Sequence, residues 1–176
     1  PWFKNAEATT LQHLGKSYRI TDFAVVQDST ILQTEKIQAV IDKAYQAGGG
    51  VVVIPRGTFL SGSLFFKAKT HLHLEEGAVL KGSDDIADFA LQLTRMEGQT
   101  LKYFSALVNA DKVDGFTVSG KGTLDGNGLR YWKAFGLRRA FNPDCTNMDE
   151  MRPSILYVSN SKNVQVSGIH MKDSPF

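Results

Sequence analysis

The sequence of 176 residues lacks several features that would narrow its class at once. Its single cysteine, Cys145, excludes an intrachain disulfide, and no apolar run approaches the roughly 18 residues of a transmembrane helix. The 20 basic and 18 acidic side chains form no run of five like charges, which excludes a basic arm for nucleic acid. The N-terminal segment PWFKNAEATT lacks a signal-peptide pattern. We therefore expect a soluble chain, with any export signal already removed and no membrane or nucleic-acid partner.

Short apolar runs separated by glycine or proline are the most informative feature that is present. Hydrophobic residues make up 42% of the chain, enough for one domain over 1–176 with a real core. Strands of three or four residues do not hold a sheet alone, but they are stable when the chain coils and each strand stacks on the next turn. Within residues 48–83 this pattern predicts a parallel β-solenoid, with strands at 51–54, 58–60, 64–66, 71–74 and 78–80.

A helix over about 35–47 is predicted just before these strands. Thr34 is a suitable N-cap, and Gly48 stands where a left-handed residue ends a helix. A solenoid has an open apolar end, so a helix with one apolar stripe is a natural cap for it. The stripe consists of Ile37, Val40, Ile41 and Ala44.

The other segments have patterns of their own. A strand is indicated at 18–23, a polar loop at 27–29, a short helix within 84–96 and a strand at 105–108.

An internal repeat lies in the second half of the chain. Residues 106–120, ALVNADKVDGFTVSG, align without gaps on residues 154–168, SILYVSNSKNVQVSG, at an offset of 48 residues. That offset fits two coils, or one coil and an insertion. The insertion is favoured because residues 129–153 are rich in aromatic, Arg, Asp and Asn residues and lack strand periodicity. Long structureless excursions in a compact fold usually carry function.

Several longer motifs follow one another along the chain, and together they resemble one enzyme family. They are ITDFAVVQDST, TEKIQAVIDKAYQAGGGVVVIPRGTFLSGSL, LHLEEGAVLKGS, GKGTLDGNGLRYW and RPSILYVSNSKNVQVSGIHMKDSPF. The first is shared by many β-helix proteins, whereas the later ones resemble the N-terminal part of the polygalacturonases, glycoside hydrolase family 28. This sequence departs from the family at Ala24 and Ser29, where related sequences commonly have glycine.

The resemblance implies an all-β fold, the right-handed parallel β-helix with an N-terminal capping helix, and an inverting hydrolysis of α-1,4-galacturonosyl linkages in pectin. It implies no cofactor and no metal, a pectic polysaccharide or oligogalacturonide as substrate, a monomer, and a secreted or periplasmic location. The family's catalytic motifs, Asn-Thr-Asp, Asp-Asp, Gly-His-Gly and Arg-Ile-Lys, lie C-terminal to the Ser-Pro-Phe that here ends at Phe176. We expect an N-terminal portion of a larger enzyme, with catalytic residues beyond Phe176 and no activity of its own.

Three other motifs suggest chemistry but have simpler explanations. Asp84 and Asp85 stand where acidic residues favour the first turn of a helix. His71 and His73 alternate with leucines on a strand, so both face outward, and a third or fourth metal ligand is not evident. Residues 115–122 nearly match a phosphate-binding loop, but part of that segment is predicted as strand.

Trp132 and Arg152, at the inserted segment, are the candidate substrate-binding residues. An aromatic ring stacks on the apolar face of a sugar, and a guanidinium pairs with a uronate carboxylate. The alternative is a surface loop that packs its own aromatics and pairs its arginines with Asp144, Asp149 or Glu150.

Two other functions stay open at this point. A non-catalytic β-helix module, such as a carbohydrate-binding, tailspike or adhesin domain, would offer a binding face without acid chemistry. A pectate lyase would require calcium and alkaline pH.

Overall fold

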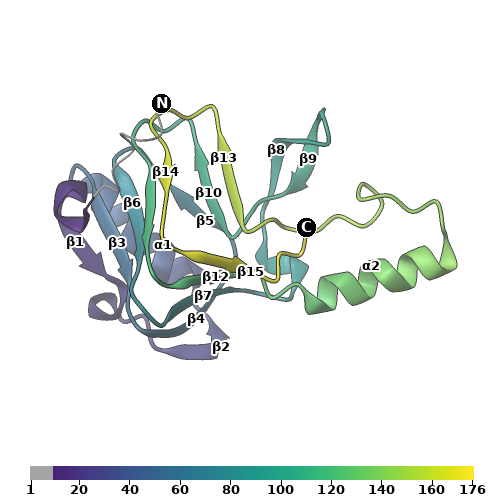
Figure 1. Cartoon of the computed structure of the whole chain (residues 1–176), viewed down its shortest axis with the longest axis horizontal. Coiled ribbons are helices and arrows are strands. Elements are labelled where there is room, and N and C mark those ends of the chain that lie inside the picture. Colours follow the sequence, from purple (N-terminus) through teal and green to yellow (C-terminus); the bar gives the residue numbers. More distant parts are fainter. Residues whose placement is uncertain (1–9) are drawn as a thin grey trace.

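The structure, a computed structural model, describes residues 10–176, and short parallel strands dominate it (Figure 1). The chain passes through three parallel sheets, A, B and C, in that order, and then returns to A. Sheet A contains β1 (Ser17–Arg19), β3 (Gly50–Ile54), β6 (Thr70–Leu74), β11 (Thr117–Gly120) and β14 (Gln165–Val166). Sheet B contains β15 (His170–Lys172), β12 (Thr123–Asp125), β7 (Ala78–Gly82), β4 (Gly57–Ser61) and β2 (Asp28–Leu32). Sheet C contains β13 (Leu156–Ser159), β10 (Val108–Asp111) and β5 (Leu64–Phe66).

The core consists of side-chain columns, because each strand pairs in parallel with the strand of the next coil. Alternate residues of a strand point inward and meet the equivalent residue one coil away. The columns are Val52, Leu72 and Val118 in sheet A, Phe59, Leu80 and Leu124 in sheet B, and Leu64, Val108 and Leu156 in sheet C. The predicted parallel β-helix is therefore confirmed, as are the five strands predicted between residues 51 and 80.

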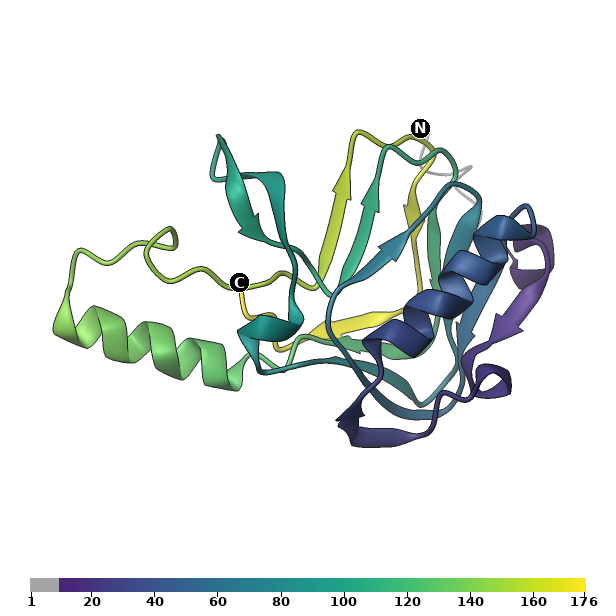
Figure 2. The ribbon, with the colours of Figure 1, turned by 180° about the vertical axis from the view of Figure 1, so that it is seen from behind.

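Helix α1 (Thr34–Gln46) covers the N-terminal end of the coil, as predicted (Figure 2). Its apolar stripe is buried, with Ile37 and Ile41 fully inaccessible. Gln38 also acts on the free edge of sheet C: its amide accepts from Phe65 N at 2.8 Å and donates to Phe65 O at 3.0 Å. The side chain thus replaces the missing neighbour of edge strand β5. Thr34 is the first helical residue rather than the N-cap, and its hydroxyl accepts from Gly62 N at 2.7 Å.

Several local predictions near the N-terminus are wrong. Only β1 is extended in the region predicted as a strand at 18–23, because η3, a 3-10 helix at Ile20–Phe23, follows it. Ala24 ends η3 in the left-handed conformation, with φ 60°, at a position where glycine would be unstrained. The segment predicted as a polar loop contains the start of β2.

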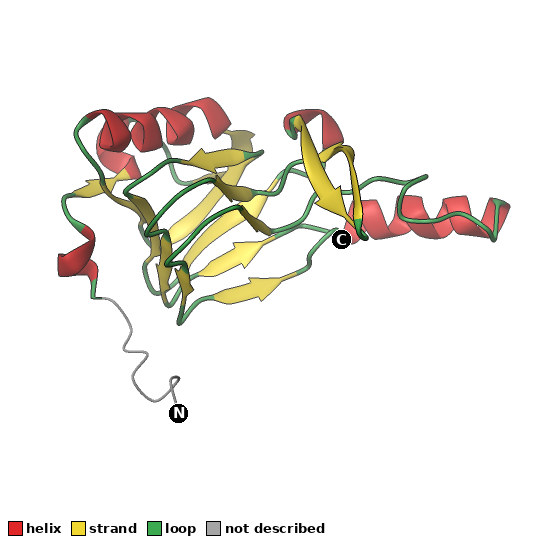
Figure 3. Ribbon diagram, turned by 90° about the horizontal axis from the view of Figure 1, so that it is seen from above, coloured by secondary structure: helices red, strands yellow, loops and turns green. Residues whose placement is uncertain are grey.

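Two excursions from the coil also differ from the predictions. The segment 84–96 forms η4 (Ile86–Asp88) and then β8 (Leu91–Met96), which pairs antiparallel with β9 (Gln99–Phe104) in a hairpin. The inserted segment is not structureless, since α2 (Leu129–Phe141) occupies its first half and extends away from the stacked strands (Figure 3). No helix among residues 10–176 is long and apolar enough to cross a membrane.

The predicted repeat is one coil with an insertion. Val108 pairs with Leu156 and Thr117 with Gln165, both at the 48-residue offset. The glycines of the two Val-Ser-Gly endings explain why this part of the pattern recurs. Gly120 has φ 114°, and a β-carbon there would lie 1.9 Å from Leu74 O of the preceding coil. At Gly168 a β-carbon would lie 2.4 Å from Gly120 O, so both turns need glycine for close backbone stacking.

We therefore expect Gly120→Ala to lower the free energy of unfolding by about 2–4 kcal/mol, since it combines a left-handed φ with a backbone clash. Chemical denaturation followed by circular dichroism measures the change. Gly136→Ala is the matched control, because it lies on the exposed part of α2 with nothing within 4 Å of the added methyl group. An equal loss of stability in both variants would contradict this account.

Candidate functional site

Both long excursions leave the coil at the same corner, where the chain passes from sheet B to sheet C. Hairpin β8–β9 lies between β7 and β10, and α2 with its return loop lies between β12 and β13. The segment 173–176 follows β15 at the equivalent place in the last coil. In Figure 1 the hairpin, α2 and the C-terminus project on the same side of the coil. This corner is the candidate functional site.

Arg152 lies at the centre of the corner and is 7% exposed. Its Nε donates to Pro175 O at 2.8 Å, its Nη1 to Glu150 O at 3.2 Å, and its Nη2 to Asn147 Oδ1 at 2.8 Å. Its backbone N–H donates to the Tyr103 hydroxyl at 3.2 Å. The buried guanidinium is therefore bonded on both of its terminal nitrogens and on Nε.

Aromatic rings enclose the same guanidinium. The Arg152 Cζ lies 4.0 Å from the centroid of the Phe135 ring and 5.5 Å from that of Phe176. Tyr103, which is fully buried, meets Phe176 edge to face at 6.2 Å and donates its hydroxyl to Asn147 O at 3.2 Å. Contacts between a cation and aromatic faces are stronger when both are desolvated. The hairpin, α2 and the segment after β15 are joined here.

Trp132 is more accessible, with 44% of its surface exposed. Its indole N–H donates to Ser174 O at 2.9 Å, and its ring packs on Gly128, where a β-carbon would lie 2.8 Å from it. The ring borders a hollow of about 360 Å³ that the outer face of sheet B also lines. The polar side chains of this hollow are Lys81, Asp125, Asn127, Lys172 and Asp173.

A second hollow, of about 420 Å³, lies between hairpin β8–β9 and the outer face of sheet C. Although burial acts in the opposite direction, hydrogen bonds with Ser159 and Thr94 lower the pKa of Tyr157 in this groove. Arg95 and Lys112 contribute positive charge, and Asp111 contributes one negative charge. The hydroxyl groups and cations of the groove could bind a hydroxylated, anionic ligand.

Asp84 and Asp85 lie just before a short helix and have structural contacts, although neither stands in the first turn of the helix as predicted. Asp85 is the N-cap of η4, and its Oδ1 accepts a hydrogen bond from Ala87 N at 3.0 Å. Asp84 Oδ1 lies 4.0 Å from Nη1 of Arg130, at the start of α2. Beside them Tyr131 donates to Ser83 O at 3.1 Å, and burial, with the nearby aspartates, raises the pKa of its phenol. These groups fix α2 on the coil.

The two predicted binding residues have different surroundings in the structure. Trp132 presents a ring to solvent, whereas the guanidinium of Arg152 is directed into the protein. The alternative account holds for Arg138, which pairs with Glu150 at 3.1 Å. Sequence reasoning did not find Tyr103 or Phe135, and the motif Ser-Pro-Phe was the only signal for Phe176.

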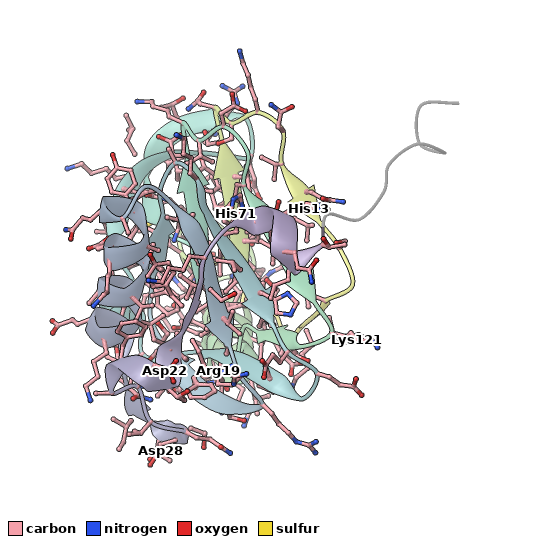
Figure 4. The ribbon with its side chains drawn as sticks, turned by 90° about the vertical axis from the view of Figure 1, so that its left-hand side faces the viewer. His13, Arg19, Asp22, Asp28, His71 and Lys121 are labelled. Carbon is pink, nitrogen blue, oxygen red and sulfur yellow. The ribbon has the colours of Figure 1, made fainter. Side chains whose placement is uncertain are left out.

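His71 and His73 lie on the outer face of sheet A, away from the corner (Figure 4 labels His71). His71 Nδ1 accepts from Thr117 N at 3.1 Å, and His73 Nδ1 lies 2.9 Å from Ser119 Oγ. Across residues 10–176 no three His, Cys, Asp or Glu side chains are grouped in a way that could hold a metal ion. The segment that resembles a phosphate loop contains β11, as predicted.

The stacked coil with its corner excursions defines a parallel β-helix protein, and comparison with known proteins specifies the family. The sequence model of glycosyl hydrolases family 28 matches residues 50–176. The exo-poly-α-D-galacturonosidase of Dickeya chrysanthemi is 34% identical over 139 residues, which cover 73% of this chain and 22% of that enzyme. The chain belongs to glycosyl hydrolases family 28.

Other relatives agree with this assignment. A probable endo-xylogalacturonan hydrolase A of Aspergillus oryzae is 26% identical over 148 residues, which cover 81% of this chain and 31% of that protein. The crystal structure of a hyperthermoactive exopolygalacturonase from Thermotoga maritima matches with a TM-score of 0.78 and 25% identity, over 92% of this chain and 42% of that one. The chain thus spans about a fifth to a third of the length of these curated relatives.

The two outward histidines predict a pH dependence of stability. Burial lowers the pKa of His71, and it lowers that of His73 against the opposing charge of Glu75. Below about pH 6.5 these two histidines therefore bind protons more readily in the unfolded chain than in the folded chain. The free energy of unfolding falls as the pH falls. We expect the free energy of unfolding to decrease from about pH 7 to pH 5, and a double variant His71→Gln, His73→Gln to have a smaller slope in that range.

Urea titrations at a series of pH values measure these slopes. His170→Gln, which replaces an exposed histidine on β15, is the control. A double variant with the slope of the unmodified protein would disprove the role of these two histidines.

Proposed function

We propose that this chain forms the capped first part of a glycoside hydrolase that cleaves the α-1,4-galacturonosyl linkages of pectin with inversion. The observation that carries the proposal is the 34% identity to an enzyme named for its action on poly-α-D-galacturonide. In an inverting glycosidase one carboxylic acid protonates the leaving oxygen, and a carboxylate across the ring activates water. We assign both roles to segments that follow Phe176 in a longer form of the protein.

In this proposal the candidate corner forms one wall of the substrate cleft. The exposed ring of Trp132 suits the apolar face of a sugar, and the polar side chains around it can bond the hydroxyl groups of that sugar. Arg95 and Lys112, in the groove beside the hairpin, would attract uronate carboxylates. The direct contact predicted for Arg152 stays a prediction, and the burial of its guanidinium favours a supporting role.

We extend the proposal to the substrate, the location and the partners of the protein. The substrate is a pectic polysaccharide or oligogalacturonide in the plant cell wall, and the protein acts as a secreted or periplasmic monomer without a cofactor. Neither a membrane nor a nucleic acid is a partner.

The purified 176-residue chain should release no reducing ends from polygalacturonate, because the carboxylate pair that inversion requires is assigned to segments after Phe176. A longer form that carries Asn-Thr-Asp and Asp-Asp segments should release them, with the anomeric configuration inverted in the first product. A colorimetric reducing-end assay and proton NMR of fresh product test the two statements.

The controls distinguish the alternatives. Hydrolysis by the 176-residue chain itself would refute our placement of the catalytic residues. A longer form that binds polygalacturonate without cleaving it would instead identify a carbohydrate-binding or adhesin-type module.

Trp132→Ala should weaken binding of an oligogalacturonide to the 176-residue chain by about tenfold, since the loss of a ring contact costs roughly 1.5 kcal/mol. Titration calorimetry measures the affinity. Phe141→Ala, which removes a 94% exposed ring from the far end of the same helix, is the matched control. Equal affinity for the Trp132 variant and the unmodified chain would remove Trp132 from the cleft.

A further inference from the structure

The donors of Arg152 are directed at acceptors from two different segments. Nη1 and Nη2 bond the return loop after α2, at Glu150 O and Asn147 Oδ1, and Nε bonds Pro175 O in the segment after β15. These acceptors stand 2 to 23 residues away in sequence. A planar, forked donor can satisfy such acceptors together, whereas an ammonium group on a flexible stem cannot. The geometry is that of a link between chain segments.

The segment after β15 and helix α2 each contribute a contact to Arg152 beside Trp132. The indole N–H of Trp132 donates to Ser174 O at 2.9 Å, and Arg152 bonds the adjacent carbonyl, that of Pro175. On the helix, Phe135 lies three residues after Trp132 and therefore on the same face of α2. The Arg152 guanidinium packs on that ring at 4.0 Å. Arg152 thus contacts two neighbours of Trp132, the Phe135 ring and the segment that contains Ser174, without being the direct partner of Trp132.

The accessible ring of Trp132 needs such support. Residues 173 to 176 follow the short strand β15, and two hydrogen bonds join them to the start of α2, from Gly128 N to Asp173 O and from Trp132 Nε1 to Ser174 O. A third, from Arg152 Nε to Pro175 O, joins them to the return loop after α2. A ring that is 44% exposed can rotate when its indole partner moves. Binding surfaces gain affinity when the contacting side chain is held in its bound orientation beforehand.

We propose that Arg152 is a positioning residue that fixes the orientation of the Trp132 ring by anchoring the segment 174–176 against α2. The inference rests on the proposed function only in that it treats Trp132 as the sugar contact. Arg152 itself does not touch the sugar, and its charge is used on the carbonyl and amide oxygens of the protein and on two aromatic rings.

The test uses the 176-residue chain with Trp2→Phe, which leaves Trp132 as the single tryptophan; Trp2 lies outside the described residues. Arg152→Lys and Arg152→Met are compared by fluorescence without ligand and by titration with an oligogalacturonide. Both variants should shift the Trp132 emission to longer wavelength and increase its quenching by acrylamide. Both should bind about tenfold more weakly, the factor expected when one hydrogen bond that orients the ring is lost.

The ligand-free fluorescence separates positioning from direct contact. If Arg152 instead bound a uronate carboxylate directly, both variants would lose affinity, but the emission and acrylamide quenching of the unliganded chain would not change. That result would overturn the proposal. Arg139→Met is the matched control, because Arg139 also lies over the Phe135 ring, at 5.7 Å, but is exposed. It should leave both emission and affinity unchanged.

Two further measurements keep the test decisive. Should Arg152→Met fail to fold by circular dichroism, Asn147→Ala removes one acceptor of the guanidinium and should shift the emission in the same direction by a smaller amount. If the emission were unshifted in both Arg152→Lys and Asn147→Ala, the proposal would be overturned. Absence of oligogalacturonide binding by the unmodified chain would count against the proposed function, while the ligand-free fluorescence would still decide the role of Arg152.

Discussion

Parallel backbone pairing between successive coils is the constraint on which the rest of this structure depends. No strand from β3 to β15 in the three parallel sheets exceeds five residues, so none could be stable without the strand stacked on it. The pairing fixes the register, and the register places leucine, valine or phenylalanine above an equivalent residue in the interior. Close stacking also accounts for the glycines at the Val-Ser-Gly turns, where the backbone of one coil meets the carbonyl of the coil before it.

The two kinds of position that stacking leaves unsatisfied are the end of the coil and its corners. At the N-terminal end, α1 supplies an apolar stripe for the core and the amide of Gln38 for the edge of β5. At the corner between sheets B and C, the chain leaves the coil and returns without disturbing the register. The side chains that project there form hollows, and the buried cluster around Arg152 joins excursions from successive coils.

The sequence predicted what depends on local pattern. The strands between 51 and 80, the extent of α1 and the 48-residue register all follow from periodicity and turn residues, which act over a few positions. Hairpin β8–β9 and α2 were missed because their apolar residues do not form one stripe, as the exposure of Leu93 and Leu137 shows. The environment of Arg152 could not be predicted, since Pro175 and Tyr103 lie 23 and 49 residues away. Only the folded corner brings these groups together.

The shared corner has a consequence for how such proteins diversify. The ends of each excursion are held a fixed distance apart by the paired strands on either side, so extra residues add only a small, slowly growing loop entropy. Insertions and deletions at this corner can therefore accumulate over evolution while the coil stays unchanged. The same scaffold can acquire new recognition surfaces by changes in segment length, a route that is closed at the tight turns where glycine touches the carbonyl of the neighbouring coil.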